Sequence, residues 1–216
     1  MKREACHVVI FAKAPRIGTV KRRLAVDIGA LAAWRCYSDI TRRLIGRLAR
    51  EPRWKLWLAV TPDDAAHHTR FWPRSRHRRA VARMPQGPGD LGQRMGRVLR
   101  DLPRGPVVIV GSDIPGIDVR AIHAAFRALR SHDAVFGPAE DGGYWLVGLR
   151  RKPRPRHYLP GRLFHAVRWS TGHALADTLA GLPKSTRIAM LHPLADVDEI
   201  ESWRAWHERK NLTTAR

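Results

Sequence analysis

Short apolar runs alternate with amphipathic segments along most of this 216-residue chain, and this alternation limits the folds it can adopt. The run 106–111 is almost entirely Val and Ile, which is typical of a strand buried on both faces. Runs with strand character cover residues 7–12, 55–61, 79–83, 106–111, 134–136, 144–149 and 186–191. Segments with helical character cover residues 30–48, 91–102, 119–130, 171–182 and 197–208, with a short helix after 62–64. Such alternation predicts an α/β fold in three α/β/α layers, with a mostly parallel central sheet.

Polar residues suited to capping a helix precede most of these helical segments. A side-chain oxygen at the N-cap accepts a hydrogen bond from the free backbone N–H groups of the first turn. The candidates are Asp63 or Asp64, Asp90, Asp118, Ser170 or Thr171, and Asp198.

The length is typical of one domain, alone or with a small appendage, and is sufficient to bury a core. Only Cys6 and Cys36 are present, so no disulfide framework is implied and a reducing cytoplasm is expected. No apolar run approaches the roughly 18 residues that a membrane span needs. The first apolar segment is too short for a signal peptide and breaks at Lys13 and Pro15. We therefore expect a cytoplasmic protein without a membrane span.

The chain is strongly basic, with 40 Lys and Arg against 19 Asp and Glu and a formal charge of +21. Such a charge favours anionic partners: nucleotides, phosphorylated substrates, nucleic acid or an acidic membrane surface. Basic residues gather at 42–55, 70–83 and 150–156. We interpret them as a solvated basic surface rather than a dedicated nucleic-acid patch, so nucleic acid is not the expected partner.

Three loops that follow predicted strands carry most of the reactive side chains. In parallel sheets, ligands bind outside the carboxyl ends of the strands. Loops 13–20, 111–117 and 137–143 are therefore expected to share one edge of the sheet.

The acidic glycine loop between two predicted strands is the richest of the three in chemistry. Glu140 and Asp141 stand directly before Gly142, Gly143 and Tyr144. Because glycine lacks a Cβ, a carboxylate on such a loop can approach a metal or a sugar closely.

Carboxylates at two further places suit a divalent cation. Asp113 ends the Val/Ile strand within Gly-Ser-Asp-Ile-Pro-Gly, and Asp118 is available to cap the next helix in its place. Mg²⁺ prefers hard oxygen ligands and needs only one or two carboxylates beside phosphates and water. Asp196 and Asp198 precede the last predicted helix, where a cap role for Asp198 is the alternative and the spacing alone favours it.

The first loop is basic and contains glycine, as a diphosphate site requires. Lys13, Arg16, Gly18 and Lys21 lie between a strand and a helix start, and backbone N–H groups there can bind phosphate. The spacing matches neither a P-loop nor a dinucleotide-binding loop, and a solvated turn is the alternative. Segment 86–95, which contains Gln93, is open to the same two interpretations: nucleotide contact, or a loop followed by a helix cap.

Five motifs in fixed order resemble the bacterial DUF2064 family, also called the radical-SAM/selenodomain-associated transferase 1 family. They are Phe-x-Lys-x-Pro-x-x-Gly-x-Val-Lys at 11–21, Gly-Ser-Asp-x-Pro-Gly at 111–116, Gly-Pro-Ala-x-Asp-Gly-Gly-Tyr at 137–144, Trp-Ser-Thr at 169–171 and Asp-Val-Asp at 196–198. The resemblance spans roughly residues 7 to 205, and five ordered motifs are far more specific than any one of them. Members of the family are often described as glycosyltransferases of the arsenosugar-biosynthesis type.

The resemblance implies a nucleotide-diphospho-sugar transferase fold of the GT-A kind, as a single domain over residues 1–216. It also implies roles for individual residues, which we take as expectations. Nucleotide binding falls to Lys13, Arg16, Gly18, Lys21 and Gln93; Mg²⁺ or Mn²⁺ binding to Asp113, Asp196 and Asp198; acceptor binding to Gly142, Gly143 and Tyr144; and catalysis to Asp141 or Glu140.

The expected function is metal-dependent glycosyl transfer from a nucleotide-diphospho-sugar to a small-molecule acceptor. A nucleotidyltransferase, which joins an NTP to a phosphorylated or carboxylated acceptor and releases pyrophosphate, is the alternative on the same fold. A protein that binds anions or nucleic acid without catalysis is the third interpretation, motivated by the charge.

Overall fold

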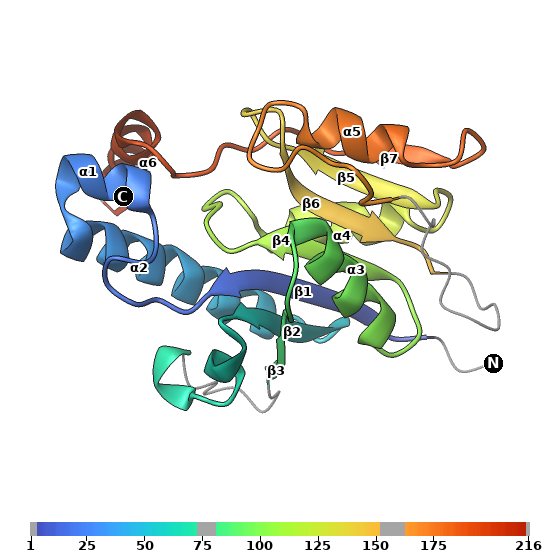
Figure 1. The fold of residues 1–216 in the computed structure, drawn as a ribbon, viewed down its shortest axis with the longest axis horizontal. Helices are drawn as coiled ribbons and strands as arrows, with labels where there is room; N and C mark the ends of the chain where they lie inside the picture. Colours follow the sequence, from blue (N-terminus) through green and yellow to red (C-terminus); the bar gives the residue numbers. More distant parts are fainter. Residues whose placement is uncertain (1–3, 73–80, 152–162, 215–216) are drawn as a thin grey trace.

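The computed structural model describes residues 4–72, 81–151 and 163–214 (Figure 1). Within them, one seven-stranded sheet has the order β3-β2-β1-β4-β6-β5-β7. The strands are β1 (Cys6–Lys13), β2 (Trp54–Thr61), β3 (Ala82–Pro85), β4 (Val107–Gly111), β5 (Ala134–Pro138), β6 (Tyr144–Leu149) and β7 (Ile188–Met190). Strand β6 is antiparallel to β4 and β5, and the other neighbouring pairs are parallel. The predicted α/β fold with a mostly parallel sheet is confirmed.

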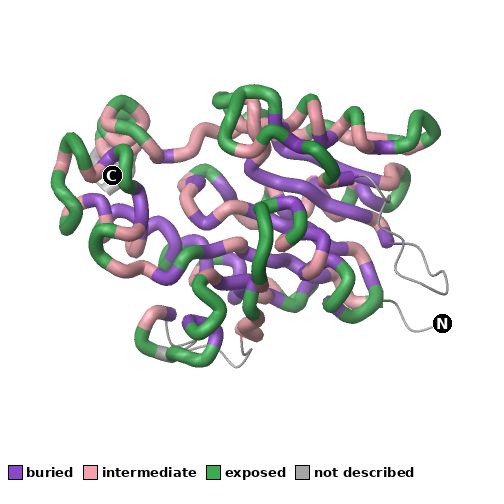
Figure 2. The backbone as a smooth tube through the Cα atoms, viewed as in Figure 1, coloured by how far each residue is buried: buried purple, intermediate pink, exposed green. Residues whose placement is uncertain are grey.

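Helices cover both faces of this sheet. They are α1 (Arg22–Ile28), α2 (Ala30–Ala49), α3 (Leu91–Asp101), α4 (Val119–Ala128), α5 (Ala174–Ala180) and α6 (Ile200–Thr214), with 3-10 turns η1 (Asp63–Ala66) and η2 (Thr69–Phe71). Side chains alternate across β1, so Val8 and Ile10 pack with α2 and α4, whereas Val9 packs with α3. Figure 2 shows the buried backbone concentrated along the central strands. A smaller cluster, which includes Leu24, joins α1, α2 and α6.

The caps divide into confirmed and incorrect predictions. Asp90 and Asp118 accept hydrogen bonds from the first turns of α3 and α4, as predicted. The other predicted helix caps are wrong. Helix α5 begins only at Ala174, and His173 occupies its N-cap without a side-chain bond, so neither Ser170 nor Thr171 caps it.

Two other predicted caps are replaced by tertiary contacts. Pro62 holds the N-cap of η1; Asp63 instead accepts from the Gly87 N–H, and Asp64 pairs with Arg16. The carboxylate of Asp198 accepts from Lys21, two residues before α6 begins.

The structure also corrects element boundaries. Strand β3 begins at Ala82, whereas the predicted strand was 79–83, of which residues 79 and 80 lie outside the described part. None of the helices in the described ranges is long and apolar enough to cross a membrane.

Candidate active site

Three loops leave the same edge of the sheet, as the sequence predicts. Strands β1 and β4 are parallel neighbours, and β5 runs in their direction because both β4 and β5 pair antiparallel with β6. The chain after each of these strands therefore begins at one edge. We call residues 13–21 the basic loop and residues 137–143 the acidic loop.

A buried lysine joins the basic loop to two of the predicted metal ligands. The Lys21 Nζ donates to Asp113 Oδ2 at 2.7 Å and to Asp198 Oδ1 at 3.3 Å. The Lys21 side chain is only 3% exposed, whereas the Asp113 and Asp198 side chains are 35% and 36% exposed. Arg23 approaches Asp198 Oδ2 at 3.6 Å from the solvent side. The loop after β1, the loop after β4 and the segment before α6 thus meet at one ammonium group.

The backbone of Lys21 is strained at this position. Lys21 is the N-cap of α1 and has φ 49° and ψ 50°, in the left-handed region. A non-glycine residue there costs about 1–2 kcal/mol. Burial lowers the pKa of Lys21, but Asp113 and Asp198, with Asp196, outweigh it and the pKa is raised. Lys21 is therefore a cation inside the fold, held by aspartates of two other segments.

Asp196 belongs to the same electrostatic cluster. Burial is the largest cause of the rise of its pKa to about 6, and Lys21 opposes this rise. Asp113, Asp198 and Asp141 raise it further by charge repulsion. The acidic loop therefore lies within electrostatic reach of the other carboxylates.

The carboxylates fit a divalent cation in donor chemistry. Asp113, Asp196 and Asp198 offer hard oxygen ligands of the kind that Mg²⁺ and Mn²⁺ prefer. In the described ranges, however, no three His, Cys, Asp or Glu side chains are arranged to hold one ion together. Lys21 lies between two of the three predicted ligands, so the cluster is closed on an ammonium.

Other predicted phosphate-binding side chains of the basic loop also contact the protein. The Lys13 Nζ donates to the Thr19 carbonyl at 2.7 Å, within the loop itself. Arg16 pairs with Asp64 at 3.0 Å and lies over the Phe71 ring. Gly18 has φ 77°, and a Cβ built on it would meet open space.

Gln93 participates in the capping box of α3. Its Oε1 accepts from the Asp90 N–H at 3.1 Å, while its own N–H donates to Asp90 Oδ1 at 2.8 Å. A nucleotide contact through Oε1 would compete with the first of these bonds.

The acidic loop is fixed through its backbone. Asp141 Oδ1 accepts from the Gly143 N–H at 2.9 Å, and the Gly142 carbonyl accepts from the Leu175 N–H at 3.1 Å. A Cβ on Gly142 (φ 81°) would overlap the backbone of Gly172. Glu140 and Asp141 themselves are exposed. The loop is therefore held against the start of α5 while its two carboxylates face solvent.

Tyr144 packs below this loop, on the α3 and α5 face of the sheet. Its ring contacts Phe136 and Trp169 edge-on, and its hydroxyl accepts a long bond from Thr178. Burial raises the pKa of the Tyr144 hydroxyl, which therefore stays protonated at neutral pH. Of the three predicted acceptor-binding residues, Tyr144 is the one most engaged in the core.

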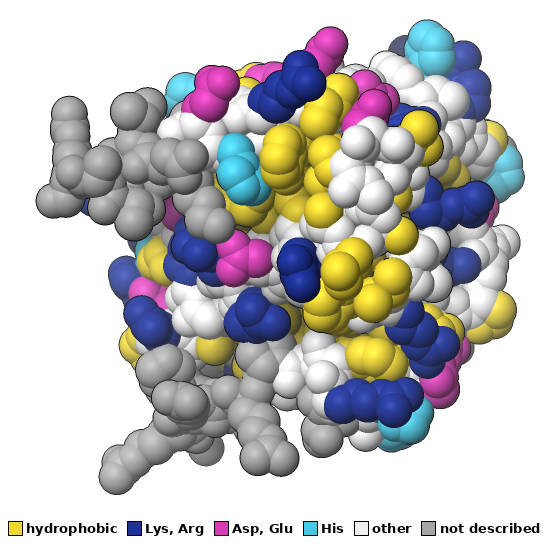
Figure 3. All heavy atoms as spheres, turned by 90° about the vertical axis from the view of Figure 1, so that its left-hand side faces the viewer, with side chains coloured by type: hydrophobic (Ala, Val, Ile, Leu, Met, Phe, Trp, Pro, Cys, Tyr) yellow, Lys and Arg dark blue, Asp and Glu magenta, His cyan; other side chains and the backbone are white. Residues whose placement is uncertain are grey.

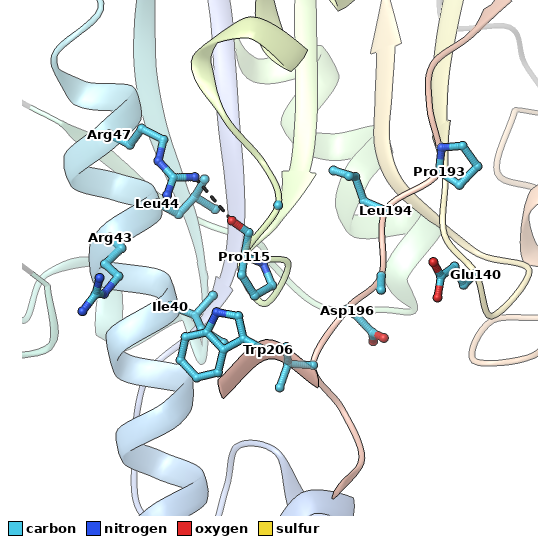
Figure 4. Close-up of a pocket in the computed structure, with 13 residues that line it drawn as sticks. Ile40, Arg43, Leu44, Arg47, Pro115, Glu140, Pro193, Leu194, Asp196 and Trp206 are labelled. Atoms are coloured by element: carbon cyan, nitrogen blue, oxygen red, sulfur yellow. Dashed lines mark hydrogen bonds between the residues drawn. The ribbon is translucent and has the colours of Figure 1, made fainter. Parts of the chain in front are cut away.

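A cavity of about 540 Å³ adjoins the carboxylate cluster on the α2 side (Figure 4). Ile40 and Leu44 of α2 form an apolar wall, and Pro115 and Trp206 lie beside it. Asp196 and Glu140 line the other side of the cavity. The volume is within the usual range for small-molecule sites.

One polar residue of this region, Tyr37, escaped the sequence analysis. The Tyr37 hydroxyl, buried on α2, donates to the Lys13 carbonyl at 2.9 Å and lies 3.0 Å from Ser112 Oγ. It therefore ties the end of β1 to the end of β4. A tyrosine on the buried face of a helix carries no motif, so only its contacts identify this role.

The basic surface does not form one continuous stripe on the side of α1, α2 and α6. Figure 3 shows Lys and Arg side chains separated there by hydrophobic and neutral surface. Residues 73–80 and 152–162, which hold much of the other two predicted basic clusters, lie outside the described part of the chain.

Solved structures similar to this chain are transferases or share their fold. A candidate nucleotide-diphospho-sugar transferase from Desulfovibrio desulfuricans G20 is 26% identical, with 93% of this chain and 85% of that chain covered and a TM-score of 0.82. A 4-diphosphocytidyl-2C-methyl-D-erythritol synthase from Anaerococcus prevotii is 11% identical over 92% and 94% of the two chains, with a TM-score of 0.58. Rv0371c from Mycobacterium tuberculosis, in complex with manganese, is 14% identical over 94% and 97%, with a TM-score of 0.51. The latter two matches show the fold alone, and the predicted nucleotide-diphospho-sugar transferase fold is confirmed.

A search of curated proteins finds no significant match to the sequence. The family model described as "Uncharacterized protein conserved in bacteria (DUF2064)" matches residues 44–171, which is more than half of the chain. The chain therefore belongs to the DUF2064 family.

Proposed function

We propose that this chain is a glycosyltransferase that uses a nucleotide-diphospho-sugar donor with Mg²⁺ or Mn²⁺. The observation that carries the proposal is the meeting of Lys21, Asp113 and Asp198 at the edge from which the basic and acidic loops leave. Cationic and anionic groups gathered at a strand edge suit a ligand that carries both a diphosphate and a cation. The likeness to the Desulfovibrio transferase supports the donor class.

The donor diphosphate would lie against the basic loop. Lys13, Arg16 and Lys21 would neutralise the charge that develops on the leaving nucleoside diphosphate. The open space at Gly18 leaves room for phosphate to approach the backbone. Each of these cations already contacts a carbonyl or a carboxylate of the protein. Donor binding would therefore replace these contacts with contacts to phosphate.

Asp113, Asp196 and Asp198 would hold the divalent cation. When bound, such a cation supplies Lewis-acid stabilisation of phosphate oxygens. Burial, and then repulsion from Asp113, Asp198 and Asp141, raise the pKa of Asp196, and a bound cation would relieve that repulsion.

The acceptor would approach from the acidic loop and the neighbouring cavity. Glu140 lines that cavity, and Asp141 is oriented by the Gly143 N–H, so either carboxylate could take the proton of an acceptor hydroxyl. The oxygen then forms the new bond to the sugar carbon as the bond to the diphosphate breaks. Gly142 and Gly143 would leave space for the acceptor; Tyr144 would support the loop from below.

Nucleotidyl transfer is the second candidate. The fold shared with the Anaerococcus cytidylyl enzyme favours it, and the same carboxylates would then serve the α-phosphate. Pyrophosphate release from an NTP would identify this reaction, whereas nucleoside diphosphate release from a nucleotide-sugar would identify glycosyl transfer.

The products therefore test the proposal. The purified protein would be incubated with panels of nucleotide-sugars and NTPs in Mn²⁺, and the phosphorus products would be resolved by ³¹P NMR. Water can replace the unknown acceptor in slow turnover. Nucleoside diphosphate formation that is lost in Asp113→Asn but kept in Asp118→Ala, a helix-cap variant of the same segment, is the expected result. Absence of turnover of every nucleotide would overturn the assignment.

We further propose that residues 1–216 act as one transferase domain on small molecules in the cytoplasm. The two cysteines and the dispersed basic side chains of Figure 3 support this setting. Salt-sensitive binding to arbitrary DNA without any metal requirement would favour the third interpretation, an anion-binding protein without catalysis.

A further inference from the structure

Lys21 bonds to two of the three carboxylates that would hold the divalent cation under the proposed function. Its ammonium lies 2.7 Å from Asp113 and 3.3 Å from Asp198, and its side chain is almost fully buried. It is also one of the cations expected to bind the diphosphate. One side chain is thus assigned two positions that it cannot occupy at once.

We propose that Lys21 is an internal competitor of the divalent cation, which Lys21 admits by moving onto the donor diphosphate. This inference rests on the proposed function, because it concerns the same cation and the same donor. It implies that cation and diphosphate binding are coupled: the diphosphate draws the ammonium away from Asp113 and Asp198, and the cation takes the carboxylates that the ammonium leaves. The free protein should therefore bind the cation weakly by itself.

Three features of the site support such an exchange. Lys21 adopts the left-handed backbone conformation at the junction between the basic loop and α1, where a change of backbone angles relieves strain. Asp113 and Asp198 are each about one-third exposed, so a hydrated cation can reach them from solvent. Asp196 adds a third carboxylate within electrostatic reach, so the aspartates outnumber the ammonium they share.

Arg23 also pairs with Asp198, but it is an exposed counter-ion, whereas Lys21 is buried. Arg23 contacts Asp198 Oδ2 at 3.6 Å and Glu199 at 3.5 Å, and its side chain is 68% exposed. An exposed arginine of this kind can compensate the outer oxygen of Asp198 without blocking the cluster. Of these two cations, Lys21 is the one buried between carboxylates from two segments, so its removal should open the site.

The experiment uses Mn²⁺ alone as the probe and needs no knowledge of the donor. Binding would be measured by loss of the free-ion electron paramagnetic resonance signal, for the wild type, Lys21→Met and Arg22→Met. Arg22 is the exposed neighbour of Lys21, so the control removes the same charge from the same helix start. We expect Lys21→Met to bind Mn²⁺ at least about tenfold more tightly, within the range of ordinary coupling between sites. Arg22→Met should stay within about threefold of the wild type, as expected for an exposed charge.

Equal or weaker Mn²⁺ binding by Lys21→Met would overturn the proposal. Asp113→Asn in the Lys21→Met background should remove the gain; a gain that persists would place the ion elsewhere and also overturn it. If Lys21→Met does not fold without metal, Lys21→Gly, which relieves the backbone strain, provides the same comparison.

Failure of the inference about Lys21 can be distinguished from failure of the proposed function. A wild type that turns over nucleotide-sugars beside a Lys21→Met variant with no gain in Mn²⁺ affinity would leave the function standing and refute the exchange. Tighter Mn²⁺ binding without turnover of any nucleotide would support the competition between Lys21 and the cation, at a cation site of another activity, and would remove the donor from the account.

Discussion

The basic loop and the acidic loop lie at the same edge of the sheet but are held in different ways. In the basic loop, Lys13, Arg16 and Lys21 bond to a carbonyl or to carboxylates through their charged ends. In the acidic loop, Gly142 bonds and packs through its backbone, and Glu140 and Asp141 remain exposed.

This difference separates groups that must move from groups that are already in place. Cations that a phosphate would need are engaged with protein partners, so a donor must exchange those contacts. The carboxylates proposed to serve the acceptor stand on a backbone fixed by close packing. Ligand binding should therefore remodel the basic loop and leave the acidic loop unchanged.

The largest effect on turnover should come from Asp113, the carboxylate that bonds to Lys21 of the basic loop. We expect Asp113→Asn to lower donor turnover by about 100-fold or more, equivalent to about 2.7 kcal/mol, because it removes both a cation ligand and the partner of Lys21. Steady-state assays with the donor identified by ³¹P NMR measure this loss. The cap variant Asp118→Ala should lose about 1 kcal/mol of stability with near-normal turnover. Equal activity in Asp113→Asn and the wild type would contradict the comparison.

Two glycines test how differently the loops are held. Gly142→Ala combines a positive φ with overlap on Gly172, and we expect it to cost about 2–4 kcal/mol in the free energy of unfolding. Gly18→Ala has a similar φ but open space around it, and should cost only about 1 kcal/mol. Urea denaturation of both variants gives the difference. Similar costs would mean that the acidic loop is no more tightly fitted than the basic loop.

The pH dependence of stability tests the carboxylate cluster. Because the pKa of Asp196 rises from 3.8 to about 6 on folding, its protonated form is favoured in the folded state. That stabilisation is complete below pH 3.8 and is lost as the pH rises through about 6. Asp196→Asn should therefore gain about 1 kcal/mol over the wild type between pH 4 and pH 7.5, since solvent screens this half-buried group.

Thermal unfolding with a chelator present measures the gain of Asp196→Asn without interference from metal. A difference between variant and wild type that stays constant from pH 4 to pH 7.5 would show that burial and the nearby carboxylates do not raise the pKa of Asp196 in the folded protein.

The smallest effect should come from Gln93, whose side chain closes the capping box of α3. We expect Gln93→Ala to lose about 0.5–1 kcal/mol of stability while donor affinity changes little. Calorimetric titration with the donor, beside Asp90→Ala as a cap control, separates the two roles. A tenfold loss of donor affinity in Gln93→Ala alone would favour the nucleotide contact expected from the sequence.

Local patterns were enough to predict the sheet and its edge. Val/Ile runs that end in glycine and aspartate predict strands that deliver side chains to an edge, and Asp90 and Asp118 cap the helices that follow. The predicted start of α5 was wrong because a distant contact, the hydrogen bond from the Leu175 N–H to the Gly142 carbonyl, fixes the turn before this helix.

The contacts within the site could not be predicted in the same way. Lys21 and Asp113 stand out in the sequence, but separately, as a phosphate ligand and a metal ligand. Their mutual bond joins residues 92 positions apart and depends on the register of β1 beside β4. The raised pKa of Asp196 likewise depends on burial and on three carboxylates, two of them from distant segments, with Lys21 opposing the rise.

The most direct test of the central claim is donor binding at the sheet edge where Lys21 bonds to Asp113. Calorimetric titration would compare UDP-, GDP-, CDP-, ADP- and dTDP-sugars in the presence of Mn²⁺ or chelator, for the wild type and Asp113→Asn. We predict that at least one nucleotide-sugar binds the wild type only with Mn²⁺, and that Asp113→Asn loses this binding. Nucleotide-sugar binding that is equally strong with chelator and in Asp113→Asn would contradict the account.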